Sequence, residues 1–211
     1  MPIDTVINTH GGEILATGVT FEEYLVRFDG IHCELVDGNV IKMSPVWLGH
    51  QDLQVYLLLL LNMYFDLKPL GKIIPQPFVQ RLTLADSKRE PDLLMILNEN
   101  LAHLKQTYLD GPADICIEIA SPGTEDIDRG DKFLEYEKGG VGEYWLFAPR
   151  RTEALFYRLN AEGLYVPQQV DQRGNYRTQL LPDFELHVPT LWQTPLPSLS
   201  AIVKSVQAMM K

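Results

Sequence analysis

The sequence is poor in cysteine, and that scarcity excludes two classes of protein. Among 211 residues there are only two cysteines, Cys33 and Cys116, each within an apolar stretch and neither in a metal-binding or redox spacing. A disulfide-stapled scaffold and a cysteine-based zinc domain are therefore both excluded. We predict that both residues are buried thiols in a reducing compartment.

The sequence also lacks a membrane-spanning run and a secretion signal. Its longest strongly apolar stretch, residues 55–65, is shorter than the roughly 20 residues that a transmembrane helix needs. Residues 1–18 contain no basic segment followed by an apolar run and a small-residue cleavage site. We therefore expect a cytoplasmic protein.

Positive charge is scarce as well. Lysine and arginine number 18 against 28 acidic residues, for a formal net charge of −10, which excludes a uniformly basic face for DNA. No base-reading motif is visible, so no recognition sequence is predicted. Local basic groups can still contact phosphates if the fold gathers them around one cleft, although a solvated surface is the simpler interpretation. These groups are Lys68 and Lys72; Arg81, Lys88 and Arg89; and Arg150 and Arg151.

The organisation of the chain favours a single domain. Its length and its 45% hydrophobic content suit one core, and no repeat or low-complexity linker divides it. We predict one domain over residues 1–211, with residues 1–19 as an N-terminal extension and residues 199–211 as a C-terminal helix.

Local patterns predict the elements of the first half. Thr20, followed by Glu22 and Glu23, predicts the start of a short helix. The pair Asp37-Gly38 between two alternating segments predicts a hairpin with a type I′ turn. Residues 49–65 predict a central helix that is apolar nearly all round, and residues 72–84 predict a strand that prolines bend or confine to an edge.

The second half predicts a crossover unit. Residues 115–119 and 143–149 are typical of buried strands, and residues 128–140 between them predict a helix that ends at two glycines, so the two strands should be parallel. Residues 91–97 predict another buried strand. Hairpins on either side should add antiparallel strands to this sheet, which gives a mixed α/β (α+β) fold.

Two carboxylates interrupt these buried strands. Asp92 and Glu118 each need a partner, a metal or an exit to solvent, because burying an unpaired carboxylate is costly. Glu118 shares its strand face with Cys116 and Ala120, so it has no partner within its own strand. If the two acids converge, their oxygens suit Mg²⁺ or Mn²⁺, and Lys132 can orient a water or neutralise phosphate charge. Ordinary salt bridges or positions at strand ends are the alternative.

Four stretches of the sequence carry a family resemblance: "CELVDGNVIKMSP" followed by His50, "EPDLLMI", "IEIASPGTEDIDRGDKFLEYEKGGVGEYWLFAP" and "LPDFELHV". They resemble the Uma2 family of restriction-endonuclease-like proteins, within the PD-(D/E)xK nuclease superfamily. The resemblance covers roughly residues 21–188, and the stretch over residues 117–149 is its most specific part. It implies a restriction-endonuclease-like mixed β-sheet with flanking helices and a Mg²⁺-dependent endonuclease, a hydrolase of phosphodiester bonds in DNA. It also implies a possible homodimer, which is common among relatives.

The resemblance also implies roles for individual residues. Asp92 and Glu118 would be metal ligands, with the backbone carbonyl of Ile119 as a third contact. The general motif places a lysine two residues after the second acid, where this chain has Ala120. In Uma2-like sequences the lysine of the following helix, here Lys132, is thought to serve instead.

Further family positions have weaker implications. Glu34 would be the acid that precedes the "PD" motif and helps to complete the metal site, and His50 would contact phosphate or water or act as a structural residue. Lys132 has a simpler alternative, which is an ion pair with Asp128 one helical turn earlier. Three aromatic residues of the third motif are assigned to the core: Tyr136, Tyr144 and Trp145.

Two other functions stay open at this point. The absence of a lysine at position 120 and the acidic net charge favour a non-catalytic binding or scaffold protein that keeps a nuclease fold. A third hypothesis keeps the metal but changes the substrate to RNA or a small phosphodiester.

Overall fold

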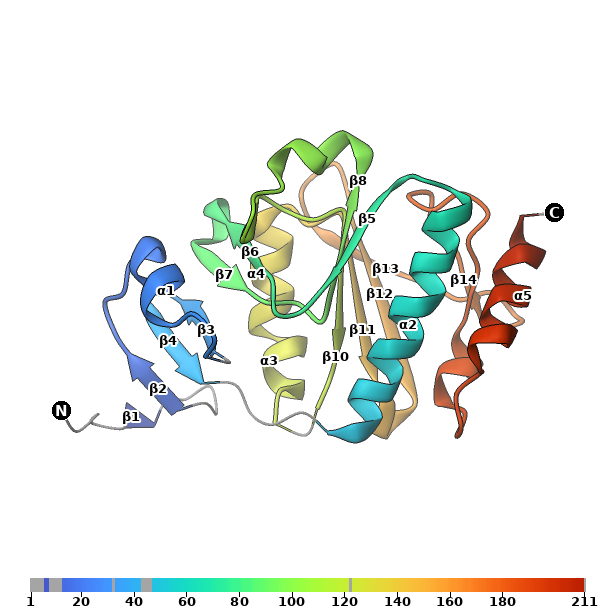
Figure 1. The fold of residues 1–211 in the computed structure, drawn as a ribbon, viewed down its shortest axis with the longest axis horizontal. Coiled ribbons are helices and arrows are strands. Elements are labelled where there is room, and N and C mark those ends of the chain that lie inside the picture. Colours follow the sequence, from blue (N-terminus) through green and yellow to red (C-terminus); the bar gives the residue numbers. More distant parts are fainter. Residues whose placement is uncertain (1–5, 8–12, 32, 43–46, 122, 211) are drawn as a thin grey trace.

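The computed structural model of the chain describes residues 6–7, 13–31, 33–42, 47–121 and 123–210 (Figure 1). Within these residues, no helix combines the length and apolar character needed to cross a membrane. Pro122, which was expected to stop a strand, lies outside the described residues. The α-helices of the described part are α1 (Phe21–Arg27), α2 (Leu48–Leu67), α3 (Glu125–Arg129), α4 (Asp131–Gly139) and α5 (Leu199–Met209).

A six-stranded sheet forms the centre of the molecule. Strands β10 and β11 pair in parallel and all other neighbours are antiparallel, so the predicted crossover unit is confirmed. The edge strand β5 begins the proline-containing segment, as predicted. The strands run in the order β13 (Tyr165–Gln168), β12 (Glu153–Leu159), β11 (Glu143–Ala148), β10 (Ile115–Ile119), β8 (Leu93–Leu97) and β5 (Gly71–Pro75).

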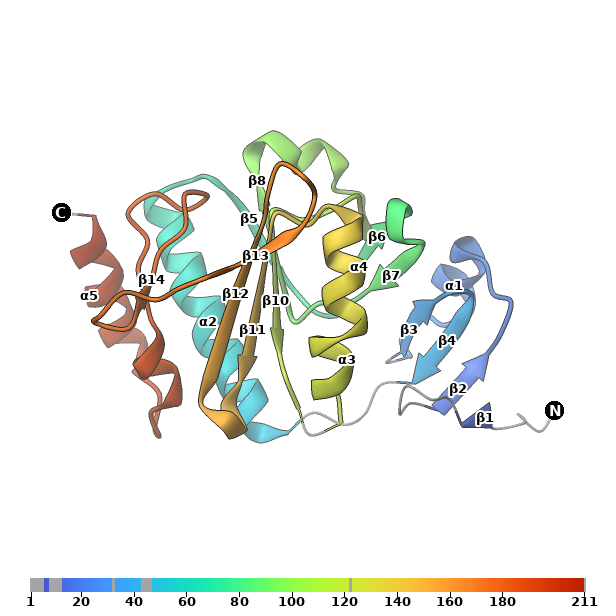
Figure 2. The same cartoon turned by 180° about the vertical axis from the view of Figure 1, so that it is seen from behind.

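Helices cover both faces of this sheet. Helix α2 lies on one face with α5 outside it, and α3 and α4 lie on the other face (Figures 1 and 2). Along β10, the odd-numbered Ile117 belongs to the core beneath α2, and the even-numbered Cys116 belongs to the core beneath α4. This alternation of period two places Glu118 on the α4 face.

The N-terminal part forms a second sheet with α1. Thr20 and Glu23 make the capping box that starts α1. Asp37 and Gly38 have φ values of 47° and 71°, which the predicted type I′ turn between β3 and β4 requires. The strand order is β1 (Val6–Ile7), β2 (Glu13–Ala16), β4 (Asn39–Lys42), β3 (Cys33–Val36), β7 (Ser87–Arg89), β6 (Val79–Leu82) and β9 (Tyr108–Asp110).

The expectation that this hairpin would extend the central sheet is wrong. Strand β3 pairs with β7, because the chain leaves the central sheet after β5 and runs through β6 and β7 before it returns as β8. In the central sheet β8 lies between β5 and β10, so it offers no edge to the hairpin. The second predicted hairpin, β12 and β13, does join the central sheet.

The helix of the crossover unit is divided. Gly130, with φ −110° and ψ −86°, separates α3 from α4. Helix α4 ends at Gly140, whose φ of 86° suits a glycine, as the two glycines predicted. Cys33 and Cys116 are buried free thiols. A short pair, β14 (Asn175–Tyr176) and β15 (Leu186–His187), and α5 complete the described fold.

Candidate active site

The two acids singled out in the sequence lie on neighbouring strands of the central sheet. Strands β10 and β8 are antiparallel, with Ile117 opposite Leu93. Extending this register by one residue places Asp92, immediately before β8, opposite Glu118. Both residues are almost completely buried, with 5% and 3% of their surface exposed. The fold therefore brings together two acids that are distant in the sequence.

Three donors hold the carboxylate of Asp92. Its Oδ2 lies 3.0 Å from Nε2 of His50 and accepts the backbone N–H of Ile119 at 2.7 Å, and its Oδ1 accepts Nε2 of Gln76 at 2.8 Å. Its backbone carbonyl accepts Nε2 of Gln54 at 2.9 Å. Asp92 is thus fixed between the start of α2, the end of β10 and the segment after β5.

The geometry of Ile119 bears on its predicted role. In an antiparallel sheet the N–H and C=O of one residue point to the same neighbouring strand. Since the N–H of Ile119 points to Asp92, its carbonyl oxygen is directed to the same side. The neighbouring N–H, of Ala120, instead points to Phe147 of β11 at 2.7 Å.

The carboxylate of Glu118 faces α4. Its Oε1 accepts the hydroxyl of Tyr136 at 2.6 Å and lies 3.0 Å from Nζ of Lys132. Lys132 also lies 3.0 Å from Oδ1 of Asp128. Both interpretations of Lys132 are therefore correct about its contacts, because it pairs with the motif acid and with the acid one turn earlier. All the side-chain contacts described for Glu118 are made by Oε1, which leaves Oε2 without a described donor.

Local structure explains this position of Lys132. Lys132 and Tyr136 are four residues apart on α4, so they lie on the same helix face and both reach Glu118. Asp128, near the end of α3, lies four residues before Lys132 and contacts it across the break at Gly130. The hydroxyl of Thr124 donates to Oδ2 of Asp128 at 2.8 Å.

The charges of this cluster shift its pKa values. Burial raises the pKa of Glu118 to about 8, against the pull of Lys132, and the charges of Asp92 and Asp128 raise it further. Burial likewise raises the pKa of Asp128. Burial opposes the charge of Lys132, yet the surrounding carboxylates hold its pKa well above the ordinary value. Lys132 is therefore a cation, whereas Glu118 largely keeps its proton at neutral pH in the metal-free protein.

Glu34 lies beside this cluster and is held by a buried arginine. Nη1 of Arg89 donates to Oε2 of Glu34 at 2.8 Å, and the backbone N–H of Glu90 donates to Oε1 at 3.2 Å. Although burial opposes ionisation, Lys132 and Arg89 lower the pKa of Glu34. Arg89 also makes two hydrogen bonds to Glu135 of α4, at 2.7 and 2.8 Å. Arg89 is 3% exposed, so it is not the phosphate contact considered from the sequence.

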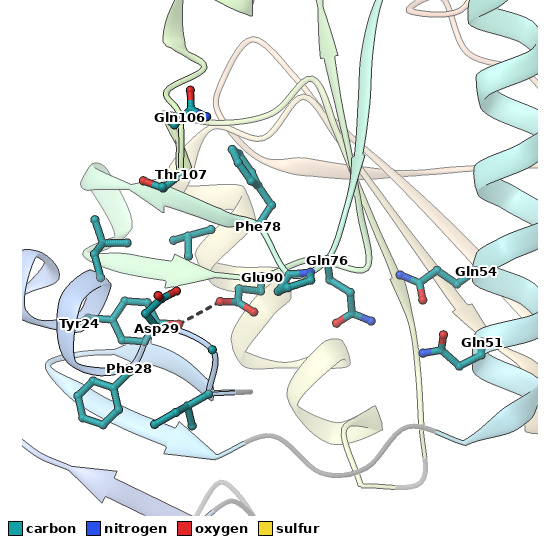
Figure 3. Close-up of a pocket in the computed structure, with 15 residues that line it drawn as sticks. Tyr24, Phe28, Asp29, Gln51, Gln54, Gln76, Phe78, Glu90, Gln106 and Thr107 are labelled. Atoms are coloured by element: carbon teal, nitrogen blue, oxygen red, sulfur yellow. Dashed lines mark hydrogen bonds between the residues drawn. The ribbon is translucent and has the colours of Figure 1, made fainter.

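A cleft of about 710 Å³ opens next to Asp92 (Figure 3). Gln54 and Gln76, which hold Asp92, also line this cleft. Its opposite wall comes from α1 and the residues that follow it, including Tyr24 and Phe28. The cleft therefore lies between α1 and α2 and reaches the two glutamines that hold Asp92, whereas neither Asp92 nor Glu118 is among its lining residues.

Comparison with known proteins identifies the family. The model of the Uma2 family, described as "Putative restriction endonuclease", matches residues 20–189. The chain belongs to the Uma2 family. Membership of Uma2 confirms the resemblance found in the sequence and supports a nuclease-type function.

A solved structure confirms the fold. The chain is similar to the crystal structure of "a putative nuclease belonging to DUF820" from Anabaena variabilis, with a TM-score of 0.64 and 16% sequence identity. The match covers 76% of this chain and 89% of that one. The restriction-endonuclease-like mixed sheet is thus shared with that protein. No curated protein matches the chain.

The residues of this Uma2 site suit a hard divalent cation. Among the described residues, no three histidine, cysteine, aspartate or glutamate side chains converge as a metal site. Mg²⁺, however, typically takes one or two carboxylates and keeps several waters or substrate oxygens. Asp92, Glu118 and the carbonyl of Ile119 offer only oxygen donors, and a bound cation would favour the ionised form of Glu118. The donor set therefore fits Mg²⁺ or Mn²⁺.

The basic groups noted in the sequence do not form one open phosphate-binding surface. Most of them pair with acids, which reduces their attraction for phosphate. Lys72 and Arg150 are exposed, and no ion pair is described for either. The paired residues are Lys68 with Asp183, Arg81 with Asp110, Lys88 with Asp86, and Arg151 with Glu125.

Sequence reasoning missed several groups that hold the acids. Tyr136 packs in the core with Tyr144, as predicted, but its hydroxyl also contacts Glu118. Its spacing of four residues from Lys132 was an available signal. Gln54 and Gln76 carried no such signal, because each reaches Asp92 only through the tertiary fold.

Proposed function

We propose that this protein is a Mg²⁺-dependent endonuclease that hydrolyses phosphodiester bonds in DNA. One observation carries the proposal. Two acids on neighbouring strands and the buried ammonium group of Lys132 lie together at one end of the central sheet. Two glutamines that hold Asp92 also line an open cleft. Family membership supports the reaction class, and DNA is the substrate that the family description suggests.

Asp92, Glu118 and the backbone carbonyl of Ile119 would hold the metal ion. A bound Mg²⁺ would supply an activated water and stabilise the departing phosphate oxygen. His50 and Gln76 orient Asp92, and Tyr136 orients Glu118, so that neither acid has to be repositioned.

Lys132 would contribute a fixed positive charge. Its ammonium group can orient the attacking water and stabilise the negative charge that develops on the phosphate. Because its pKa is raised, it acts as a cation and hydrogen-bond donor rather than as a base. Glu34 would assist, since its charge helps to keep Lys132 protonated.

The decisive experiment is cleavage of supercoiled plasmid DNA in Mg²⁺ and in Mn²⁺. We expect Asp92→Asn and Glu118→Gln to lower the rate at least about 100-fold while the circular dichroism spectrum stays unchanged. Glu162→Gln, at an exposed acid in a turn, is the matched control and should cleave like the wild type. Equal cleavage by all four proteins would refute the proposal.

The same assay on duplex DNA, single strands and RNA defines the substrate. A homodimer would place one site on each strand of a duplex, and we expect sedimentation with DNA to show two chains per complex. Preference for RNA over DNA would keep the metal site but replace the proposed substrate.

One observation favours the scaffold alternative. Both carboxylate oxygens of Asp92 already accept hydrogen bonds from the protein, so this acid is satisfied without an ion. The scaffold hypothesis predicts no Mn²⁺ binding in titration calorimetry. Saturable binding that both Asp92→Asn and Glu118→Gln abolish would exclude it.

A further inference from the structure

The chemistry of the cleft differs from that of a phosphate-binding groove. Phosphates are bound mainly by lysine, arginine and backbone N–H groups. None of the described residues that line the cleft is a lysine or an arginine, whereas Asp29 and Glu90 are acids. The lining therefore contains no cation that could bind a phosphate, and its two acids would repel one.

The same lining contains hydrogen-bonding amides and aromatic faces, which suit an uncharged, flat, polar ring. Four glutamine amides line the cleft, together with three aromatic side chains. Phe78 is only partly buried, and Figure 3 shows its ring on the side of Thr107 and Gln106, away from Gln51 and Gln54 of α2. Aromatic faces stack on nucleobases, and a glutamine amide can pair with an adenine edge. These lining residues are Gln51, Gln54, Gln76 and Gln106, with Tyr24, Phe28 and Phe78.

The cleft is connected to one of the proposed catalytic acids, Asp92, through two of its lining residues. Gln76 contributes to the cleft wall and donates to Oδ1 of Asp92, and Phe78 follows it by two residues. Gln51 is exposed on α2, one turn before Gln54, which donates to the backbone of Asp92. A nucleotide whose phosphate lies at the acids can therefore direct its base into the cleft.

We propose that this cleft is a pocket for an unpaired nucleobase near the cleaved phosphate, stacked on Phe78 and hydrogen-bonded by Gln106, which lies in the neighbouring segment that contains Thr107. The inference rests on the proposed function and narrows its substrate class to single-stranded nucleic acid, or to a duplex that presents an unstacked base. The volume of about 710 Å³ lies in the ordinary range of small-ligand pockets and leaves room for a base.

The test is fluorescence anisotropy with three 12-mer DNA probes in EDTA, so that cleavage does not contribute. The probes are a single strand, its duplex, and a strand of the same length and charge whose central nucleotides are abasic. We expect the intact single strand to bind roughly tenfold more tightly than the abasic strand, as stacking of a base on an aromatic ring predicts.

Variants assign this preference to the pocket. Phe78→Leu keeps an apolar side chain without a ring and should abolish the difference between the intact and abasic strands. Phe78→Tyr keeps the ring and should restore it. Gln106→Ala should reduce discrimination between adenine and thymine at the central position, whereas Gln207→Ala, at an exposed glutamine on α5, should not.

Each contrary outcome is informative. Equal affinity for the intact and abasic strands, a preference that survives Phe78→Leu, or no binding of any probe overturns the pocket. Cleavage assays on the wild type separate this failure from that of the proposed function. Metal-dependent cleavage without a base preference would refute the nucleobase pocket but not the proposed endonuclease. A base preference without any metal-dependent cleavage would refute the proposed endonuclease but not the nucleobase pocket.

Discussion

Nζ of Lys132 on α4 lies 3.0 Å from Oε1 of Glu118 on β10. The general nuclease motif places its lysine two residues after the second acid, and Ala120 occupies that position, on the same strand face as Glu118. A lysine from the neighbouring helix thus reaches the acid that a lysine of the strand would otherwise serve. The fold supplies the cation from a different element.

Removing the Lys132 charge should impair catalysis more than metal binding. We expect Lys132→Met to lower the plasmid cleavage rate about 100-fold, because a donor to developing negative charge is lost. Mn²⁺ affinity in calorimetry should change much less, since Lys132 is not a ligand. Lys138→Met, at an exposed position of the same helix, is the control. Similar rates for the two variants would mean that Lys132 only pairs acids.

The stability of the metal-free protein should fall as pH rises. The pKa of Glu118 is about 8 in the folded protein, against an ordinary value of 4.5, so the folded state binds more protons between these values. The stabilisation from this proton is complete below about pH 4.5 and is lost as pH rises towards 8. Its slope is at most about 1.4 kcal/mol per pH unit.

Urea unfolding in EDTA at pH 5 and pH 9 measures this effect. Asp128 titrates in the same direction, so the comparison is between the wild type and Glu118→Gln. The wild type should lose more free energy of unfolding between the two pH values than the variant does. Identical losses would show that Glu118 ionises normally.

His50 should act through the orientation of Asp92. Its Nε2 lies 3.0 Å from Oδ2 of Asp92, and its Nδ1 is buried without a hydrogen-bond partner among the described residues. Loss of a group that orients a metal ligand typically lowers metal affinity 10–100-fold. We expect His50→Ala to weaken Mn²⁺ binding by this factor and His50→Gln to restore part of it. His103→Ala, at an exposed histidine, is the control, and equal affinities would refute the role.

Local patterns were sufficient for elements that depend on neighbouring residues. The Thr20 cap, the turn at Asp37 and the helix from Leu48 follow from capping, turn and periodicity rules, and the structure confirms them. The hairpin could not be assigned to a sheet in this way, because its partner β7 lies about 50 residues further along the chain. Division into a single domain stays a prediction.

The candidate site likewise combines residues that the sequence indicated with contacts that only the tertiary fold creates. Asp92 and Glu118 stood out because each interrupts an apolar run, and the family pattern supplied the expected partner, Lys132. The contact of His50 with Asp92 spans 42 positions and that of Arg89 with Glu34 spans 55. The first pair arises from packing of α2 against the central sheet and the second from pairing of β3 with β7, and sequence periodicity encodes neither. Arg89 was accordingly taken as a surface residue.

Arg89 should be a principal source of stability. It is buried between Glu34 and Glu135, and removing one partner of a buried ion pair leaves charge uncompensated. We expect Arg89→Met to lower the free energy of unfolding in urea by about 3–5 kcal/mol. Arg27→Met, at an exposed arginine, should change it by less than about 0.5 kcal/mol. The double variant Arg89→Met, Glu34→Gln removes one of the two acids left without a partner and should recover part of the lost free energy of unfolding. If Arg89→Met is as stable as Arg27→Met, the prediction is wrong. Glu34 and Glu135 would then be solvated, and Arg89 would not link the N-terminal sheet to α4.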